Sequence, residues 1–153
     1  NIPKSDKTTI VHGDYRLGNL IYDLNEPKVI AVLDWELSTL GHPLADLGYN
    51  LMLHEEDSDV RSGFSLKNLD LVKLGIPTKD YLVKKYCEMV NRDVVNPNYY
   101  IAFSMFRNVA ILEGVLARGR AGNASSSLAE EKGALGKPIA KIAWDLVQHS
   151  KID

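Results

Sequence analysis

The stretch His12-Gly13-Asp14-Tyr15-Arg16-Leu17-Gly18-Asn19 decides the fold class expected for this chain. A β-type run at residues 8–11 ends where this stretch begins, and the two glycines of the stretch loosen its backbone. We therefore predict a tight loop that carries a carboxylate, Asp14, and a neutral amide, Asn19, between two short strands.

A β-hairpin is predicted directly after this loop. Leu20–Tyr22 is a short strand, residues 23–27 have turn chemistry, and Val29–Leu33 is an apolar run typical of a strand buried on both faces. The second strand ends at Asp34, and a hairpin of this length is expected to bring Asp34 back beside Asn19.

The loop has the spacing His-x-Asp-x4-Asn, which is that of the catalytic loop of protein kinases. Phosphoryl transfer needs a carboxylate that accepts or orients the proton of the attacking hydroxyl, and Asp14 is the candidate for this base. The reaction also needs oxygen ligands for Mg²⁺, and Asn19 and Asp34 are the candidates. Because Asn19 is neutral, it adds a ligand without repelling Asp14.

Helical patterns dominate the chain after residue 40. Helices are predicted at residues 44–53, from Thr78 to about residue 91, from Pro97 to about residue 121, and from Ser127 towards the C-terminus. Pro43 suits the first turn of the first helix, Thr78 can cap the second, and a Ser127-x-x-Glu130 capping box opens the last. Residues 55–75 are predicted to form a loop. Strands come first and helices follow, which predicts an α+β fold that is mostly helical.

The helix that begins near Pro97 is predicted to lie at the centre of the core, because apolar residues recur along one of its faces. This face comprises Ile101, Met105, Val109, Leu112 and Leu116, and Phe103, Phe106 and Ala110 are expected to thicken it. Three basic residues, Arg107, Arg118 and Arg120, lie along the same helix. A solvated helix face is the favoured interpretation of these three residues.

Composition narrows the classes of function. The 153 residues fit one domain, with 45% hydrophobic and 25% charged residues, as in ordinary globular proteins. The net charge of -2 and the scattered basic residues argue against a nucleic-acid-binding protein. No apolar run approaches the roughly 20 residues of a membrane span. The single cysteine, Cys87, is expected in the core and suits a reducing compartment. We therefore expect an intracellular location, without distinguishing the cytoplasm, the mitochondrion and the peroxisome.

A third motif, Gly41-His42-Pro43-Leu44-Ala45-Asp46-Leu47-Gly48, completes the pattern. Together with the loop at 12–19 and with Asp34-Trp35-Glu36, it resembles the aminoglycoside phosphotransferase and choline kinase family. The longer string from Val32 to Leu47 looks closer still to the kinase-like domain of the acyl-CoA dehydrogenase family member 10 and 11 type. The resemblance spans most of the chain. It implies the C-terminal, catalytic lobe of a protein-kinase-like fold, with a short β-hairpin that bears the site.

The resemblance implies a role for each residue of the site. Asp14 would be the catalytic base, and Asn19 and Asp34 would be the Mg²⁺ ligands of an ATP-dependent enzyme. Asp46 would accept backbone hydrogen bonds from the catalytic loop, and His12 would brace that loop.

Two further residues have less definite roles. Arg16 stands where bacterial relatives commonly have His, and it can meet phosphate or an acidic group of the substrate. Glu36 is either an additional metal ligand or substrate contact, or a structural anchor for its loop, and the second interpretation is slightly favoured.

Kinase-like enzymes also need a strand lysine that holds the nucleotide phosphates, on a lobe that precedes the catalytic loop. The residues before His12 are too few to contain that lobe. The chain, residues 1–153, is therefore expected to be a single-domain fragment that lacks the N-terminal lobe and is nearly inactive alone. The missing lobe and an acyl-CoA dehydrogenase domain of the parent protein are the expected partners.

Three functions remain open. The leading hypothesis is ATP- and Mg²⁺-dependent phosphoryl transfer to a hydroxyl of a small molecule, for which the resemblance suggests a hydroxy-acyl compound. The second is a non-catalytic, pseudokinase-like module that docks a partner domain. The third is a metal-dependent hydrolase that uses Asp14, Asp34 and Glu36, but it gives no reason for the His-x-Asp-x4-Asn spacing.

Overall fold

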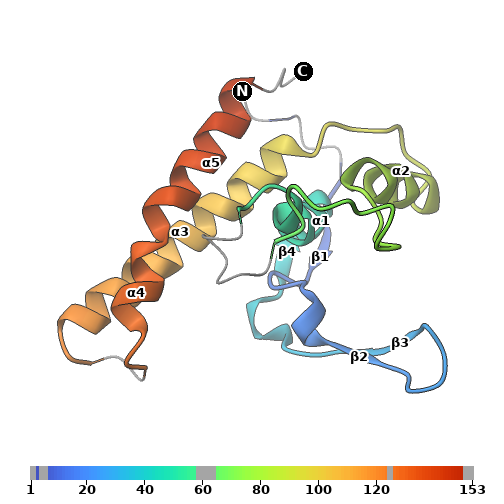
Figure 1. The fold of residues 1–153 in the computed structure, drawn as a ribbon. Coiled ribbons are helices and arrows are strands. Elements are labelled where there is room, and N and C mark those ends of the chain that lie inside the picture. Colours follow the sequence, from blue (N-terminus) through green and yellow to red (C-terminus); the bar gives the residue numbers. More distant parts are fainter. Residues whose placement is uncertain (1–2, 4–6, 58–64, 124–125, 150–153) are drawn as a thin grey trace.

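The computed structural model describes residue 3 and residues 7–57, 65–123 and 126–149 (Figure 1). The α-helices are α1 (Leu44–Leu51), α2 (Lys79–Met89), α3 (Asn98–Arg120), α4 (Ala129–Ala134) and α5 (Gly136–His149). The strands are β1 (Thr9–Val11), β2 (Leu20–Tyr22), β3 (Val29–Val32) and β4 (Thr39–Gly41). Short 3-10 turns lie at Leu17–Asn19, Trp35–Leu37 and Met52–His54. The predicted combination of strands and helices is confirmed, although about half of the chain, rather than most of it, is helical.

The long helix α3 is the centre of the core, as predicted. It packs against α1, α4 and α5, and Figure 1 shows α5 running along it. Ile101 and Met105 of α3 are fully buried, and Cys87 of α2 lies in the same cluster. The rest of the buried cluster comprises Leu51, Met52, Val83, Ala102, Ile139 and Ala143.

A close contact between two backbones fixes α1 against the start of α3. A Cβ atom added to Gly48 would lie 2.5 Å from the carbonyl carbon of Tyr100, a distance that real Cβ atoms do not show. Only glycine therefore lets the two helices approach this closely. The contact matters for the site because α1 carries Asp46 and Tyr49.

By length and composition alone, α3 is long and apolar enough to cross a membrane. The search for uninterrupted apolar runs in the sequence did not single out this helix. In the described residues α3 packs against α1, α4 and α5, and 28% of its most apolar 18-residue window is buried. Three further expectations about the helix were wrong, because Phe103, Phe106 and Ala110 are exposed rather than part of the apolar stripe.

The strands form two separate two-stranded antiparallel sheets. One pairs β1 with β4, with Ile10 opposite Leu40, and the other is the predicted hairpin of β2 and β3. The expectation that β3 is buried on both faces was wrong, because Val29 and Ile30 are 41% and 55% exposed. The hairpin extends away from the helices (Figure 1), so no layer covers its faces.

The last predicted helix is divided into α4 and α5, which meet at Leu135. The predicted capping box does not form, because the residue that precedes α4 is Leu128 and no side chain caps the helix. Gly133 packs directly on Leu116 of α3, which explains why a glycine lies inside α4. The side of α5 that packs on the core includes Ile139 and Ala143, which are both buried.

Candidate active site

The loop that follows β1 holds Asp14 and Asn19 in direct contact. The side-chain nitrogen of Asn19 donates to the carboxylate oxygen Oδ2 of Asp14 at 2.8 Å and to the backbone carbonyl of Asp14 at 2.9 Å. Both partners are acceptors, so the NH₂ group of the buried Asn19 amide must face Asp14. The amide oxygen of Asn19 then faces away from the carboxylate of Asp14.

The β2–β3 hairpin brings Leu33, the residue before Asp34, into contact with Asn19. The backbone N–H of Leu33 donates to the carbonyl of Asn19 at 2.8 Å, and Asp34 is the next residue. Asp34 adopts the left-handed backbone conformation, with φ of 69° and ψ of 50°. A non-glycine residue pays a cost for this conformation, and such residues concentrate at functional sites. Asn19 and Asp34 therefore lie at adjoining ends of paired strands.

His12 connects the loop to the end of β3. Its ring is buried; Nδ1 accepts from the backbone N–H of Asp14 at 3.1 Å, and Nε2 lies 2.8 Å from the carbonyl oxygen of Leu33. Because Nδ1 is an acceptor and the Leu33 carbonyl cannot donate, Nε2 must carry the proton. The ring of His12 thus bridges the backbone of Asp14 and the backbone of Leu33, which is the residue before Asp34.

Asp46, in the first turn of α1, holds the backbone of the loop. Its Oδ2 accepts from the N–H of His12 at 2.6 Å, and its Oδ1 accepts from the N–H of Gly13 at 2.9 Å. Hydrogen bonds to a carboxylate are stronger than those between neutral groups. These two contacts tie the backbone of residues 12 and 13 to the start of α1.

The surroundings of Asp14 set the ionisation of its carboxyl group. Partial burial alone would raise the pKa of Asp14, but hydrogen bonds from Tyr49, Arg16 and Asn19 and the positive charge of Arg16 outweigh it. The pKa of Asp14 therefore lies below its ordinary value, and the group is a carboxylate at neutral pH.

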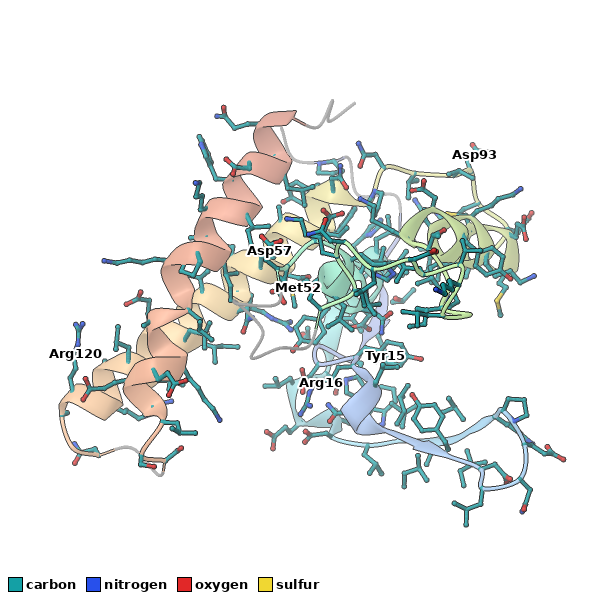
Figure 2. The ribbon with its side chains drawn as sticks, viewed as in Figure 1. Tyr15, Arg16, Met52, Asp57, Asp93 and Arg120 are labelled. Atoms are coloured by element: carbon teal, nitrogen blue, oxygen red, sulfur yellow. The ribbon has the colours of Figure 1, made fainter. Side chains whose placement is uncertain are left out.

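Arg16 is the cation of the site. Its Nε lies 3.1 Å from Oδ2 of Asp14, and its side chain is 53% exposed. The hydrogen bond to Asp14 raises the pKa of Arg16, and Asp34 and Tyr49 add smaller contributions of the same sign. Figure 2 shows Arg16 where the β2–β3 hairpin meets the rest of the chain. Arg16 thus lies within electrostatic reach of both carboxylates.

Sequence reasoning missed Arg107 and Tyr49. Arg107 of α3 donates to the backbone carbonyl of Gly13, and its guanidinium lies over the ring of Tyr49, 5.0 Å from the ring centroid. The interpretation of Arg107 as part of a solvated helix face was therefore wrong. The two partners of this hydrogen bond are 94 positions apart, so no local pattern signals the contact.

Glu36 lies exposed in the 3-10 turn that follows Asp34. The described part of the chain contains no cluster of three or more His, Cys, Asp or Glu side chains that could bind a metal ion. The carboxylate triad that the hydrolase hypothesis requires from Asp14, Asp34 and Glu36 is therefore not assembled in the described residues.

Comparison with known proteins shows which proteins this chain resembles. Residues 1–68 match the model of the phosphotransferase enzyme family. A solved structure from Ralstonia eutropha, named as a candidate aminoglycoside phosphotransferase, superposes with a TM-score of 0.84 at 43% sequence identity. The match covers 94% of this chain and 44% of that chain. The resemblance to kinase-like phosphotransferases that the sequence predicts is confirmed.

The curated relatives are larger proteins. The chain is 44% identical over 146 residues to acyl-CoA dehydrogenase family member 10 of Mus musculus. This match covers 95% of this chain and 14% of the relative. The chain is also 35% identical over 152 residues to acyl-CoA dehydrogenase family member 11 of Homo sapiens. That match covers 95% of this chain and 19% of the relative. The chain thus spans less than a fifth of the length of these relatives, and the predicted similarity to the member 10 and 11 type is confirmed.

Proposed function

We propose that this chain supplies the base and the metal ligands for ATP- and Mg²⁺-dependent transfer of a phosphoryl group to a hydroxyl of a small molecule. The observation that carries the proposal is the pair of hydrogen bonds from the Asn19 amide to Asp14. These hydrogen bonds orient the carboxylate of Asp14, the proposed base. They would also direct the amide oxygen of Asn19, the proposed ligand, away from that carboxylate. The pairing explains why the spacing His-x-Asp-x4-Asn serves phosphoryl transfer.

Asp14 is the proposed base. Its lowered pKa keeps the carboxylate ionised at neutral pH, so it can orient the acceptor hydroxyl and receive its proton as the new bond to phosphorus forms. Arg16 covers the same Oδ2 atom, and its exposed guanidinium can turn towards a phosphate or an acidic group of the acceptor. The loop is held from behind by Asp46, so the carboxylate keeps its place.

The donor set fits Mg²⁺. Asn19 would contribute its amide oxygen and Asp34 its carboxylate, and Mg²⁺ commonly takes only one or two protein oxygens together with phosphates and water. When bound, the ion would neutralise charge on the transferred phosphate. We propose that the parts that hold the rest of the nucleotide lie elsewhere in the full-length gene product.

The substrate class follows from the relatives and remains part of the proposal. Both relatives are named acyl-CoA dehydrogenases, and this chain matches only a small part of each. In such a protein, a kinase unit and a dehydrogenase unit would act on chemically related acyl compounds. We therefore propose a hydroxy-acyl compound as the acceptor and the dehydrogenase domain as a partner within the same gene product, in an intracellular compartment.

A non-catalytic docking module is the second candidate. The observation that favours it is the exposed pair Ile10 and Leu40, which lie opposite each other on β1 and β4 and are 70% and 72% exposed. An apolar pair of this kind is typical of a surface that meets another domain. The same surface is compatible with the kinase proposal. Binding of Mg-ATP therefore distinguishes the kinase from the non-catalytic docking module.

The test is calorimetric titration of Mg-ATP into the full-length gene product and its variants. Asn19→Leu and Asp34→Asn are expected to weaken the Mg²⁺-dependent part of ATP binding. Glu26→Gln, which removes one negative charge from the exposed turn of the same hairpin, is the matched control and should bind as the wild type does. Unchanged Mg²⁺-dependent binding in both site variants would contradict the metal site, and no binding by the wild type would favour the docking module.

A further inference from the structure

The backbone of Gly13, the residue before the proposed base, is held on both sides of its Cα atom by groups of opposite charge. Its N–H donates to Oδ1 of Asp46 on α1 at 2.9 Å, and its carbonyl accepts from the guanidinium of Arg107 on α3. Hydrogen bonds to ionised partners are the stronger kind. Two helices therefore fix the two successive peptide groups that flank Gly13 in this loop.

The third side of Gly13 is closed by the backbone that follows Asp34. A Cβ atom on Gly13 would lie 2.5 Å from the carbonyl oxygen of Leu37, and Gly13 has a φ of 85°. The loop cannot relax in that direction, because the chain of the 3-10 turn fills the space. In addition to the direct contacts of Asp14, three contacts thus converge on its neighbour Gly13.

Arg107 is itself held in place. Its guanidinium lies over the ring of Tyr49 on α1, 5.0 Å from the centroid. A planar guanidinium over an aromatic face is a favourable arrangement and limits the rotamers of the long side chain. Tyr49 follows Gly48, the residue that lets α1 approach the backbone of Tyr100 on α3. The close helix crossing therefore sets Tyr49 beneath Arg107.

We infer that Arg107 is a positioning residue for Asp14, acting through the carbonyl of Gly13 and seated on Tyr49. Its kinetic consequence rests on the proposed function. Arg107 donates to the loop backbone, and Asp14 in turn is held by Asn19 and Arg16. Loss of Arg107 should therefore impair the chemical step while nucleotide binding is preserved. A displacement of about 1 Å in a catalytic group can cost about 100-fold in rate.

The experiment uses the full-length gene product with Arg107→Met and Arg107→Gln. Two readouts are compared: hydrogen exchange by mass spectrometry in peptides that cover residues 12–14, and kcat and KM with Mg-ATP as the varied substrate. Arg107→Gln stays polar at a half-buried position, so it serves as the second variant if the Met variant fails to fold. Arg107→Lys keeps one charged donor for Gly13 and tests rescue.

The matched control is Arg120→Met. Arg120 is exposed on the same helix, and Figure 2 shows it at one end of the molecule, well apart from Arg16. It loses the same charge from α3 without touching the loop.

We expect faster exchange at residues 12–14 and a fall in kcat of about 100-fold in the Met and Gln variants, with KM for Mg-ATP unchanged. Arg107→Lys should recover part of both, and Arg120→Met should match the wild type. Wild-type exchange in the Met or Gln variant, or the same change in Arg120→Met, would overturn the inference. If the wild type transfers no phosphoryl group, the proposed function fails, and the exchange data still decide whether Arg107 holds the loop.

Discussion

The ring of His12 lies 2.8 Å from the carbonyl oxygen of Leu33, so the loop that carries Asp14 is joined to the strand end that carries Asp34. The two residues are 21 positions apart, and the connection runs through one protonated ring nitrogen. The opposite ring nitrogen accepts from the backbone N–H of Asp14. A single neutral imidazole thus fixes the separation of the proposed base and one proposed metal ligand.

Replacing His12 with alanine should loosen this connection. The free energy of unfolding is expected to fall by about 1–3 kcal/mol, because the Leu33 carbonyl and the Asp14 N–H lose their buried partner. Denaturant unfolding measures the loss, and phosphoryl transfer should fall as well. His54→Ala is the control, because the ring of His54 contacts the carbonyl of Pro77 at 3.2 Å, away from the site. Equal effects of both variants on activity would contradict the account.

Asp46→Asn should weaken the hydrogen bonds that hold the loop, while the size and shape of the side chain at position 46 stay almost the same. Asparagine offers one acceptor oxygen where the carboxylate offers two, so the N–H of His12 or of Gly13 would face an NH₂ group. A loss of about 1.5–3 kcal/mol in unfolding free energy is expected, as for hydrogen bonds to charged groups.

Asp80→Asn is the matched control for Asp46→Asn. Asp80 also lies in the first turn of a helix, α2, and it is exposed, so both variants remove the same interaction with the helix dipole. The difference between them reports the hydrogen bonds to the loop. No difference would show that the contacts of Asp46 contribute nothing to stability.

The ionisation of Asp14 gives the fold a dependence on pH. Because its pKa is lowered in the folded chain, the stability that its charge contributes is present above the unfolded value of about 3.9 and is lost as the pH falls through the folded value. Arg16→Gln removes a hydrogen bond and a positive charge, so the pKa of Asp14 should rise. The loss of stability on acidification should then be smaller in this variant.

Unfolding free energies measured across the acidic range test this prediction. Lys28→Gln removes one exposed positive charge from the nearby hairpin and serves as the control. Added salt should reduce the effect of Arg16, because its side chain is largely exposed. Superimposable pH profiles for Arg16→Gln and the wild type would show that Arg16 does not set the ionisation of Asp14.

Much of the site could be predicted because its residues lie close together in sequence. The loop at 12–19, the strand Leu20–Tyr22 and the position of Asp34 depend on turn chemistry and apolar runs over short distances. The start of α2 followed from Thr78, whose hydroxyl accepts from the N–H of Tyr81. These features are local, and the local signals agree with the structure.

The parts that could not be predicted depend on distant contacts. The strand β4 exists because it pairs with β1, and three residues carry no signal of their own. The exposure of β3 follows from its membership of a two-stranded hairpin, which an apolar run does not reveal. The contact of Arg107 with Gly13 joins residues 94 positions apart. A sequence pattern describes one element, whereas these features arise from how elements meet.

The measurement that tests the central claim most directly is phosphoryl transfer from ATP by the full-length gene product, with and without Asp14→Asn. Labelled γ-phosphate would be followed onto hydroxy-acyl acceptors in the presence of Mg²⁺, with Glu26→Gln as the control variant. Asparagine preserves the size of Asp14 but cannot receive the proton, so kcat is expected to fall by about 10²–10⁴-fold while the unfolding transition stays close to that of the wild type. Equal transfer by Asp14→Asn and the wild type would contradict the assignment of Asp14 as the base.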